Sequence, residues 1–238
     1  MLGIQNFDFS KDHFDLLISL QDALWPEPWK NWESAEMRHH DLKLIPKKCK
    51  FRLDFIKHQD NTIGFGTTAH DHWAFDPTLL DSTIVLPHND KYLDCAQNYL
   101  DHQIERARKM NAKVFRAWSF HGSDWVKDFY TKNGFEISLL EYISELNLDK
   151  FFISDFESSV SSFKKSSYVI LNLEELKKLN KDWQLKLFDL WKRIEHDVPS
   201  DLDLNIEFDL WKSSVFCPWF KEEDFYIVLD GDKWVALS

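Results

Sequence analysis

An internal repeat restricts the folds open to this chain of 238 residues. The segment FDLLISLQDALWP, which begins at Phe14, returns with one gap as FDLWKRIEHDVP from Phe188. The segment LDFIKHQDNTIGFG returns as DFYIVLDGDKWVALS, so that Val235 falls on Ile63. Self-similarity of this kind is typical of a structural unit that occurs twice. We expect a domain at residues 1–148, a linker at residues 149–167 and a partial second copy at residues 168–238.

Hydrophobic periodicity predicts the elements of the first copy. Ser10 is expected to cap a helix that Pro26 ends, and Ser123 a helix that Gly134 follows. Asp60-Asn61 is expected to form a hairpin turn. Strands are expected at residues 4–7, 49–59, 62–68, 82–86, 114–119 and 135–146, and further helices at residues 32–42, 92–110 and 124–133.

The second copy is expected to repeat only the beginning of this order. The sequence predicts a strand at residues 168–171, two helices and a closing hairpin. A partial copy leaves a sheet edge and an apolar face uncovered. We therefore expect it to pack on the first copy, on a partner such as a second protomer in a homodimer, or on residues that this chain does not include.

The net charge of −11 limits the classes of partner. Nucleic acids and anionic membranes both select basic surfaces, so we expect neither as a partner. The three cysteines are far apart and odd in number, which suggests a reducing cytoplasm and no disulfide framework. No segment reads as a signal peptide or a membrane span.

The segment IVLPHNDKYLDCAQNYL, residues 84–100, predicts a strand that leads into a helix through a short turn. Such a turn often binds phosphate, because the helix N-terminus offers free N–H groups and a positive dipole end. A phosphate site of this kind normally needs glycine, since a bare backbone lets the phosphate come close. This turn contains no glycine.

Three segments resemble the GNAT superfamily of acyl-CoA-dependent N-acetyltransferases. They are NTIGFGTTAHD, TIVLPHNDKYLDCAQNYLDHQIERARK and WVKDFYTKNGFE, and the last is the most specific. The repeat resembles the tandem arrangement of mycothiol synthase. The resemblance implies an α/β (α+β) fold with a mixed, mostly antiparallel sheet flanked by helices, followed by a partial second repeat of the same type.

The resemblance also implies acetyl-CoA as the acyl donor and a small amine as the acceptor. It assigns cofactor binding to Ile84, Val85, Lys91, Tyr92, Leu93, Asp94, Cys95 and Ala96. The family pattern at these positions is basic-Gly-basic-Gly-x-Gly, and only Lys91 and Ala96 fit it well. Asp94 places a negative charge where the pyrophosphate would lie, and like charges repel. We therefore expect a degenerate cofactor loop with weak or absent acyl-CoA binding.

Acyl transfer needs an acid for the leaving thiolate and a base for the amine. The resemblance assigns the acid to Tyr130, which equally fits plain core packing. The candidate bases are Glu141, His88 and Asp81. The alternative for each is a solvated surface residue with no chemical role. Two hypotheses remain open: an N-acetyltransferase, or a non-catalytic relative with a structural, ligand-binding or partner-binding role, including a fragment of a longer tandem enzyme.

A metal site is the weaker interpretation of AHDHWAFD. His70 and His72 would share a face of a strand with Asp76 nearby. A third well-placed ligand is absent from the pattern, and the segment reads as the start of a loop. We expect no metal.

Overall fold

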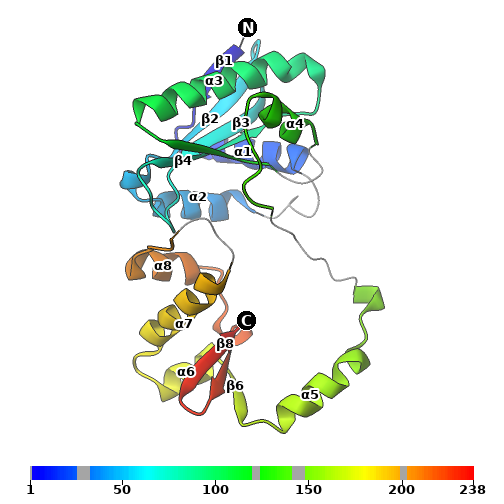
Figure 1. Cartoon of the computed structure of the whole chain (residues 1–238), viewed down its shortest axis with the longest axis vertical. Coiled ribbons are helices and arrows are strands. Elements are labelled where there is room, and N and C mark those ends of the chain that lie inside the picture. The colour runs from blue at the N-terminus through cyan, green and yellow to red at the C-terminus, as the bar shows by residue number, and fades with distance from the viewer. Residues whose placement is uncertain (1, 26–32, 120–123, 141–147, 199–202) are drawn as a thin grey trace. The chain divides into compact units, whose positions relative to one another are not determined.

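The structure, a computed structural model, describes residues 2–25, 33–119, 124–140, 148–198 and 203–238 (Figure 1). The chain divides into two compact units, Met1–Glu136 (unit 1) and Ile137–Ser238 (unit 2). Within the described ranges, no helix is long and apolar enough to cross a membrane.

Unit 1 contains a five-stranded sheet in the order β1-β2-β3-β4-β5. Neighbouring strands run antiparallel except β4 and β5, which run parallel. This confirms the predicted mixed, mostly antiparallel sheet. The strands are β1 Leu2–Asn6, β2 Arg52–His58, β3 Asn61–Ala69, β4 Leu79–Val85 and β5 Val114–Trp118, and the helices are α1 Lys11–Leu24, α2 Ala35–Leu44, α3 Leu93–Lys109 and α4 Asp124–Lys132.

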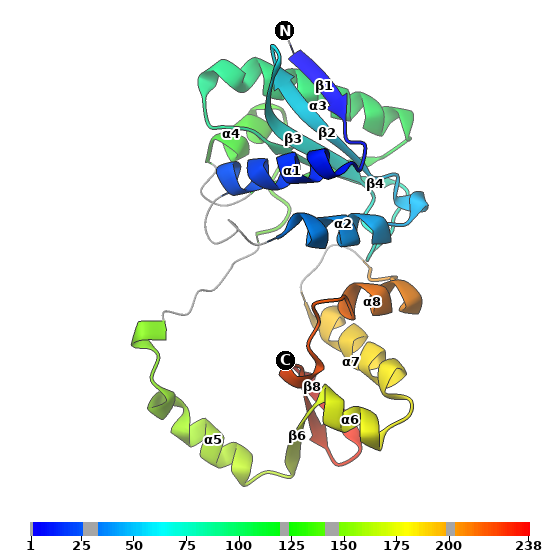
Figure 2. The same ribbon diagram turned by 180° about the vertical axis from the view of Figure 1, so that it is seen from behind.

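Helices cover both faces of this sheet (Figure 2). Side chains of a strand alternate between its faces, so Phe55 and Ile56 point to opposite sides. Phe55 packs in the core with Phe14 and Leu17 of α1. Ile56 packs in a second core with α3 and α4, whose contributions include Tyr99, Leu100, Val126, Phe129 and Tyr130. The sheet is therefore the middle layer of three.

Unit 2 contains a three-stranded antiparallel sheet in the order β6-β7-β8. Its strands are β6 Tyr168–Asn172, β7 Tyr226–Asp230 and β8 Lys233–Leu237, and its helices are α5 Glu157–Lys164, α6 Leu173–Leu179, α7 Trp183–Asp197 and α8 Phe208–Val215. Helix α6 was not predicted. Asn172 and Glu175 start it with a capping box, in which each side chain accepts from the other's backbone N–H.

The hairpins of the two units share their register. Ile56 lies opposite Gly64 in β2–β3, and Val228 lies opposite Ala236 in β7–β8. Val228 and Ala236 are the residues that the repeat aligns with Ile56 and Gly64. The ladder shifts by one residue directly after Ile56 and directly after Val228. The turn residues Gln59 and Gly231 both have φ of 58°. The two hairpins thus agree in backbone detail.

Most predicted boundaries of unit 1 lie within a few residues of the observed ones. The hairpin turn is Gln59-Asp60 and not Asp60-Asn61, because Asn61 already pairs with His58. Ser10 caps α1 as predicted by accepting from the His13 N–H. Gly134 follows α4 with φ of 85°, as expected for a residue after a helix end.

The strand expected at residues 135–146 is not formed in its described part. Residues 135–140 carry no strand, and the remainder lies outside the described residues. Phe135 instead turns into the core, with its ring centre 5.0 Å from that of Tyr130. Ser123, the predicted cap of α4, also lies outside the described residues.

The predicted linker at residues 149–167 contains a helix, α5. Phe151, Phe152 and Phe156 were expected to pack partly, but all three are exposed. The ring centres of Phe151 and Phe156 lie 5.3 Å apart, so these two contact each other.

Candidate functional site

In unit 1 the pairing between β4 and β5 ends before β4 does. The parallel pairing of β4 with β5 ends where Thr83 lies opposite Trp118. Ile84 and Val85 continue β4 beyond this point, paired only with β3 among the described residues. The carboxyl ends of parallel strands are a common location for ligand sites. The two residues expected to face the acyl group therefore lie at this end of β4.

The turn between β4 and α3 uses its own N–H groups. Asn89 accepts from the Lys91 N–H through its side chain (3.1 Å) and from the Tyr92 N–H through its carbonyl (2.9 Å). The Leu93 N–H donates to the carbonyl of Asp90. Phosphate binding at a helix N-terminus depends on free N–H groups. Three of the N–H groups in this turn are therefore already paired within the turn.

The predicted cofactor residues of the turn point in different directions. Lys91, Leu93 and Asp94 are exposed, whereas Cys95 and Ala96 are buried against the sheet. Burial raises the pKa of the Cys95 thiol. The Lys91 ammonium lies 4.6 Å from the centre of the Tyr92 ring. Among the exposed residues assigned to the cofactor, Lys91 alone is basic, whereas Leu93 is apolar and Asp94 carries a carboxylate, so these side chains fit a pyrophosphate poorly.

Tyr130 of α4 carries a buried hydroxyl in the core next to β4. Its side chain is 6% exposed and packs in the same core as Ile84. Burial raises the pKa of the phenol, and the nearby Ser82 hydroxyl acts in the opposite direction. Within the described part of the chain, neither hydroxyl is placed within good hydrogen-bond geometry of a partner. A protonated phenol beside a serine hydroxyl fits the role of an acid, and its apolar surroundings also fit core packing.

The candidate bases differ in their surroundings. Asp81 accepts two hydrogen bonds from the guanidinium of Arg116, at 2.6 Å and 3.1 Å, so its carboxylate is already engaged. The ring of His88 stacks on Trp125, with 6.1 Å between ring centres. Glu141 lies outside the described residues.

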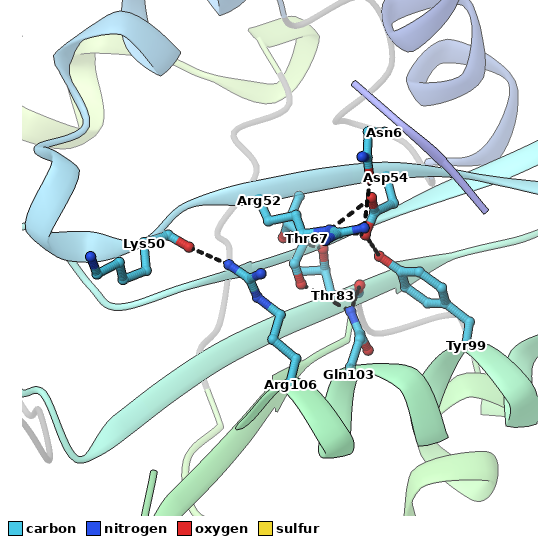
Figure 3. Close-up of polar contacts among 9 residues, drawn as sticks. All are labelled: Asn6, Lys50, Arg52, Asp54, Thr67, Thr83, Tyr99, Gln103 and Arg106. Atoms are coloured by element: carbon cyan, nitrogen blue, oxygen red, sulfur yellow. Dashed lines mark hydrogen bonds and ion pairs between the residues drawn. The ribbon is translucent and has the colours of Figure 1, made fainter. Parts of the chain in front are cut away.

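A buried polar network between α3 and the sheet was missed by the sequence reading (Figure 3). Asp54 of β2 is 2% exposed and accepts from the Arg52 Nε at 2.9 Å and 2.8 Å. The hydroxyl of Tyr99 donates to Asp54 at 3.3 Å. Burial and the neighbouring Asp54 carboxylate raise the pKa of Tyr99. The signal for this network was a charged residue inside the apolar strand LDFI.

Two further side chains attach α3 to the strands. The amide of Gln103 donates to the carbonyls of Thr67 (3.0 Å) and Thr83 (3.2 Å). Arg106 donates to the carbonyl of Lys50 at 2.7 Å (Figure 3). These bonds fix α3, the helix that follows β4 and the turn described above.

The histidines weighed as metal ligands have other roles. The Nδ1 of His70 lies 2.7 Å from the carbonyl oxygen of Leu79, and Asp76 accepts from the Thr78 N–H. Burial lowers the pKa of His72. Throughout the described ranges, no group of three or more metal-ligating side chains is placed to hold a metal ion.

Comparison with known proteins gives matches to solved structures alone. No protein-family model and no curated protein matches the chain. A transcriptional regulator from Bacillus halodurans C-125 is 10% identical, with 61% of this chain and 100% of that chain covered and a TM-score of 0.47. An aminoglycoside N-acetyltransferase in complex with CoA is 14% identical, with 61% and 95% covered and a TM-score of 0.44.

An aminoglycoside acetyltransferase from an uncultured soil metagenomic sample, in complex with sisomicin, is similar to a comparable degree. It is 13% identical, with 61% of this chain and 97% of that chain covered, and its TM-score is 0.47. At such scores these likenesses carry no argument, so the function is argued from the chain's own residues.

Proposed function

We propose that unit 1 is a GNAT-type domain that binds an acyl-CoA thioester weakly between β4 and β5 and transfers its acetyl group to a small amine. The observation that carries this proposal is the end of the parallel pairing at Thr83, which leaves Ile84 and Val85 paired with β3 alone among the described residues. The sheet order and the helices on both faces agree with the fold that the sequence resemblance implies.

The transfer assigns separate tasks to the backbone and to Tyr130. The backbone of Ile84 and Val85 holds the thioester carbonyl and the pantetheine arm. The amine nitrogen bonds to the carbonyl carbon, the carbon–sulfur bond breaks, and the thiolate leaves. The phenol of Tyr130 gives that thiolate its proton, since a phenol is protonated at neutral pH. Burial raises the pKa of this phenol and so makes it a weaker acid toward the thiolate. Glu141 remains the proposed base.

A second candidate function is a non-catalytic GNAT-like domain. The paired N–H groups of the turn before α3 favour it, since they leave little to hold a pyrophosphate. In this case Tyr130 packs the core and has no chemical role, and unit 1 serves as a structural or partner-binding scaffold.

We also propose that the chain has a domain at residues 1–148, a linker at residues 149–167 and a partial second GNAT-like repeat at residues 168–238. The shared register, the equivalent ladder shift and the equal φ of the two hairpin turns support the repeat. Helix α5 lies in the proposed linker, so the linker is not wholly without structure.

Calorimetric titration of the purified chain with acetyl-CoA and with CoA tests the enzyme proposal. We expect a dissociation constant between about 0.1 and 1 mM, which corresponds to a binding free energy of roughly −4 to −5.5 kcal/mol. Tyr130→Phe should keep this binding and lower the rate of transfer to amines. Absence of binding at millimolar ligand would overturn the enzyme proposal and favour the non-catalytic candidate.

A further inference from the structure

One face of the sheet in unit 2 is apolar, and no described residue covers it. We call it the outer face and define it by Tyr168, Ile170, Tyr226, Val228 and Val235. Ile227, which lies between two of these positions, is fully buried on the opposite face under the helices. Ile170 is 49% exposed and Val235 is 36% exposed. Strands with apolar residues on both faces are typical of sheets that are covered on both faces.

The repeat shows what covers the same face in unit 1. Ile56 corresponds to Val228 and Ile63 to Val235, and each unit pairs these strands in the same register. In unit 1, Ile56 is fully buried and Ile63 is 8% exposed. Both pack in one core with residues of α3. A helix across this face is therefore the solution that the chain already uses once.

Helix α5 carries an apolar stripe that is also uncovered. Phe156, Val160 and Phe163 recur at intervals of four and three residues, which places them on one side of a helix. Phe156 and Val160 are each 48% exposed, and no residue of α5 is buried. The ring of Phe163 already stacks on Tyr168 of the outer face, with 6.1 Å between ring centres.

We propose that α5 closes as a strap over the outer face, with its apolar stripe against Ile170, Val228 and Val235. Eight residues of α-helix are about 12 Å long, which is close to the width of three strands spaced about 4.8 Å apart. The three residues between α5 and β6 match the usual length of a connection from a helix to a strand. A tethered helix needs no encounter with a second molecule.

Charge and hydrogen bonding favour the chain's own helix as the occupant. Lys164 and Lys165 end α5 at the edge of the sheet where Asp230 and Asp232 lie in and after β7. The Ser167 hydroxyl donates to Asp230 at 3.0 Å and so holds the connection beside these carboxylates. Closure brings two cations to two anions while it buries the stripe.

Disulfide trapping tests the closure in the full chain. The native cysteines Cys49, Cys95 and Cys217 are first replaced by alanine, and Val160→Cys is then combined with Ile170→Cys. The matched control combines Val160→Cys with Leu179→Cys, because Leu179 is 76% exposed on α6, which covers the opposite face. We expect at least tenfold faster intrachain disulfide formation in the first pair than in the control, read by mass spectrometry and gel mobility under mild oxidation.

The other outcomes overturn the proposal. Equal rates in the two pairs would mean that α5 does not settle on the outer face. Disulfides that form only between chains would identify a second copy as the occupant. Val160→Asp provides an independent check in a chain without new cysteines, since it should lower the urea midpoint of unit 2 if the stripe is covered. An unchanged midpoint would mean that Val160 stays in solvent.

Discussion

Gly66 shows how the absence of one Cβ atom admits a buried ring. A Cβ at this position would lie 2.2 Å from the Cε1 of Tyr99 and 2.8 Å from the carbonyl oxygen of Thr83. Tyr99 could then no longer reach Asp54, whose carboxylate would lose one of its donors. The glycine is therefore required by the polar network and not by the backbone conformation of the strand.

We predict that Gly66→Ala lowers the free energy of unfolding by about 2–3 kcal/mol, as expected for overpacking next to a buried polar group. Gly3→Ala is the matched control in a neighbouring strand, because its Cβ would meet only the side chain of Lys57, at 3.3 Å. Urea unfolding followed by circular dichroism measures both variants. Equal losses in the two would contradict the close packing of Tyr99 on Gly66.

The two buried tyrosines predict that the free energy of unfolding of unit 1 falls at alkaline pH; we call this fall the alkaline limb. Burial raises the pKa of both Tyr99 and Tyr130 above the ordinary value of 10. Above pH 10 the unfolded chain therefore releases protons that the folded chain keeps, and stability falls as the pH rises, by up to about 1.4 kcal/mol per pH unit for each tyrosine.

Tyr130→Phe should flatten this limb, whereas Tyr168→Phe, at a position 44% exposed, should leave it unchanged. The measurement is urea unfolding at intervals from pH 8 to pH 11.5. A limb of the same slope in wild type and Tyr130→Phe would mean that the phenol is open to solvent and not protected in the core.

Residue-level predictions succeeded where local chemistry decides. The cap at Ser10 and the glycine after α4 follow from hydrogen bonding and φ alone. Cys95 and Ala96 illustrate the limit, because the resemblance to GNAT proteins assigned both to the cofactor site. In the structure both are core residues. The pairing of Asp54 with Tyr99 joins residues 45 positions apart and has no local signal.

At the scale of elements, the turn before α3 decides whether unit 1 holds a pyrophosphate. The double variant Tyr92→Gly, Asp94→Gly removes two Cβ atoms and one negative charge from the turn. We expect it to strengthen CoA binding by about tenfold, or roughly 1.4 kcal/mol, if the turn is a degenerate phosphate site. Calorimetry with CoA measures the change.

The control double variant is Gln97→Gly, Asp101→Gly. It introduces two glycines into α3 and removes one aspartate, so it matches the first variant in the number of glycines and in net charge. It lies beyond the turn and should not strengthen CoA binding. An equal gain in both would assign the effect to net charge, and no gain in either would count against the alignment of this turn with the cofactor segment of GNAT proteins.

Elements with a strong periodicity of apolar residues were predicted, and elements that depend on contacts with residues distant in the sequence were not. The alternation of apolar residues located β2 and β3, and the helical period located α3. Residues 135–140 have strand-like composition but pair with no strand among the described residues. Helix α6 begins directly at the end of β6. It is too short for a helical periodicity of apolar residues to be recognised in the sequence.

For the whole molecule, the repeat predicted the order of unit 2 and the register of its hairpin, but not the role of residues 149–167. The sequence suggested a linker there, whereas the apolar stripe of α5 and the outer face of the β6-β7-β8 sheet suggest that this helix packs on the sheet of unit 2. The two interpretations differ in where a protease should first reach the chain, because cleavage favours exposed segments without stable structure.

Limited digestion with chymotrypsin therefore tests the domain arrangement. Phe152 is 60% exposed and precedes α5, so we expect the first cut after Phe152, with fragments of residues 1–152 and 153–238 identified by mass spectrometry. Phe156 and Phe163 should resist digestion, since closure of α5 places them against the sheet. Val160→Asp, which opposes closure, should expose both sites and serves as the matched comparison. First cuts after Phe156 or Phe163 in the wild-type chain would restore the whole of residues 149–167 as a linker.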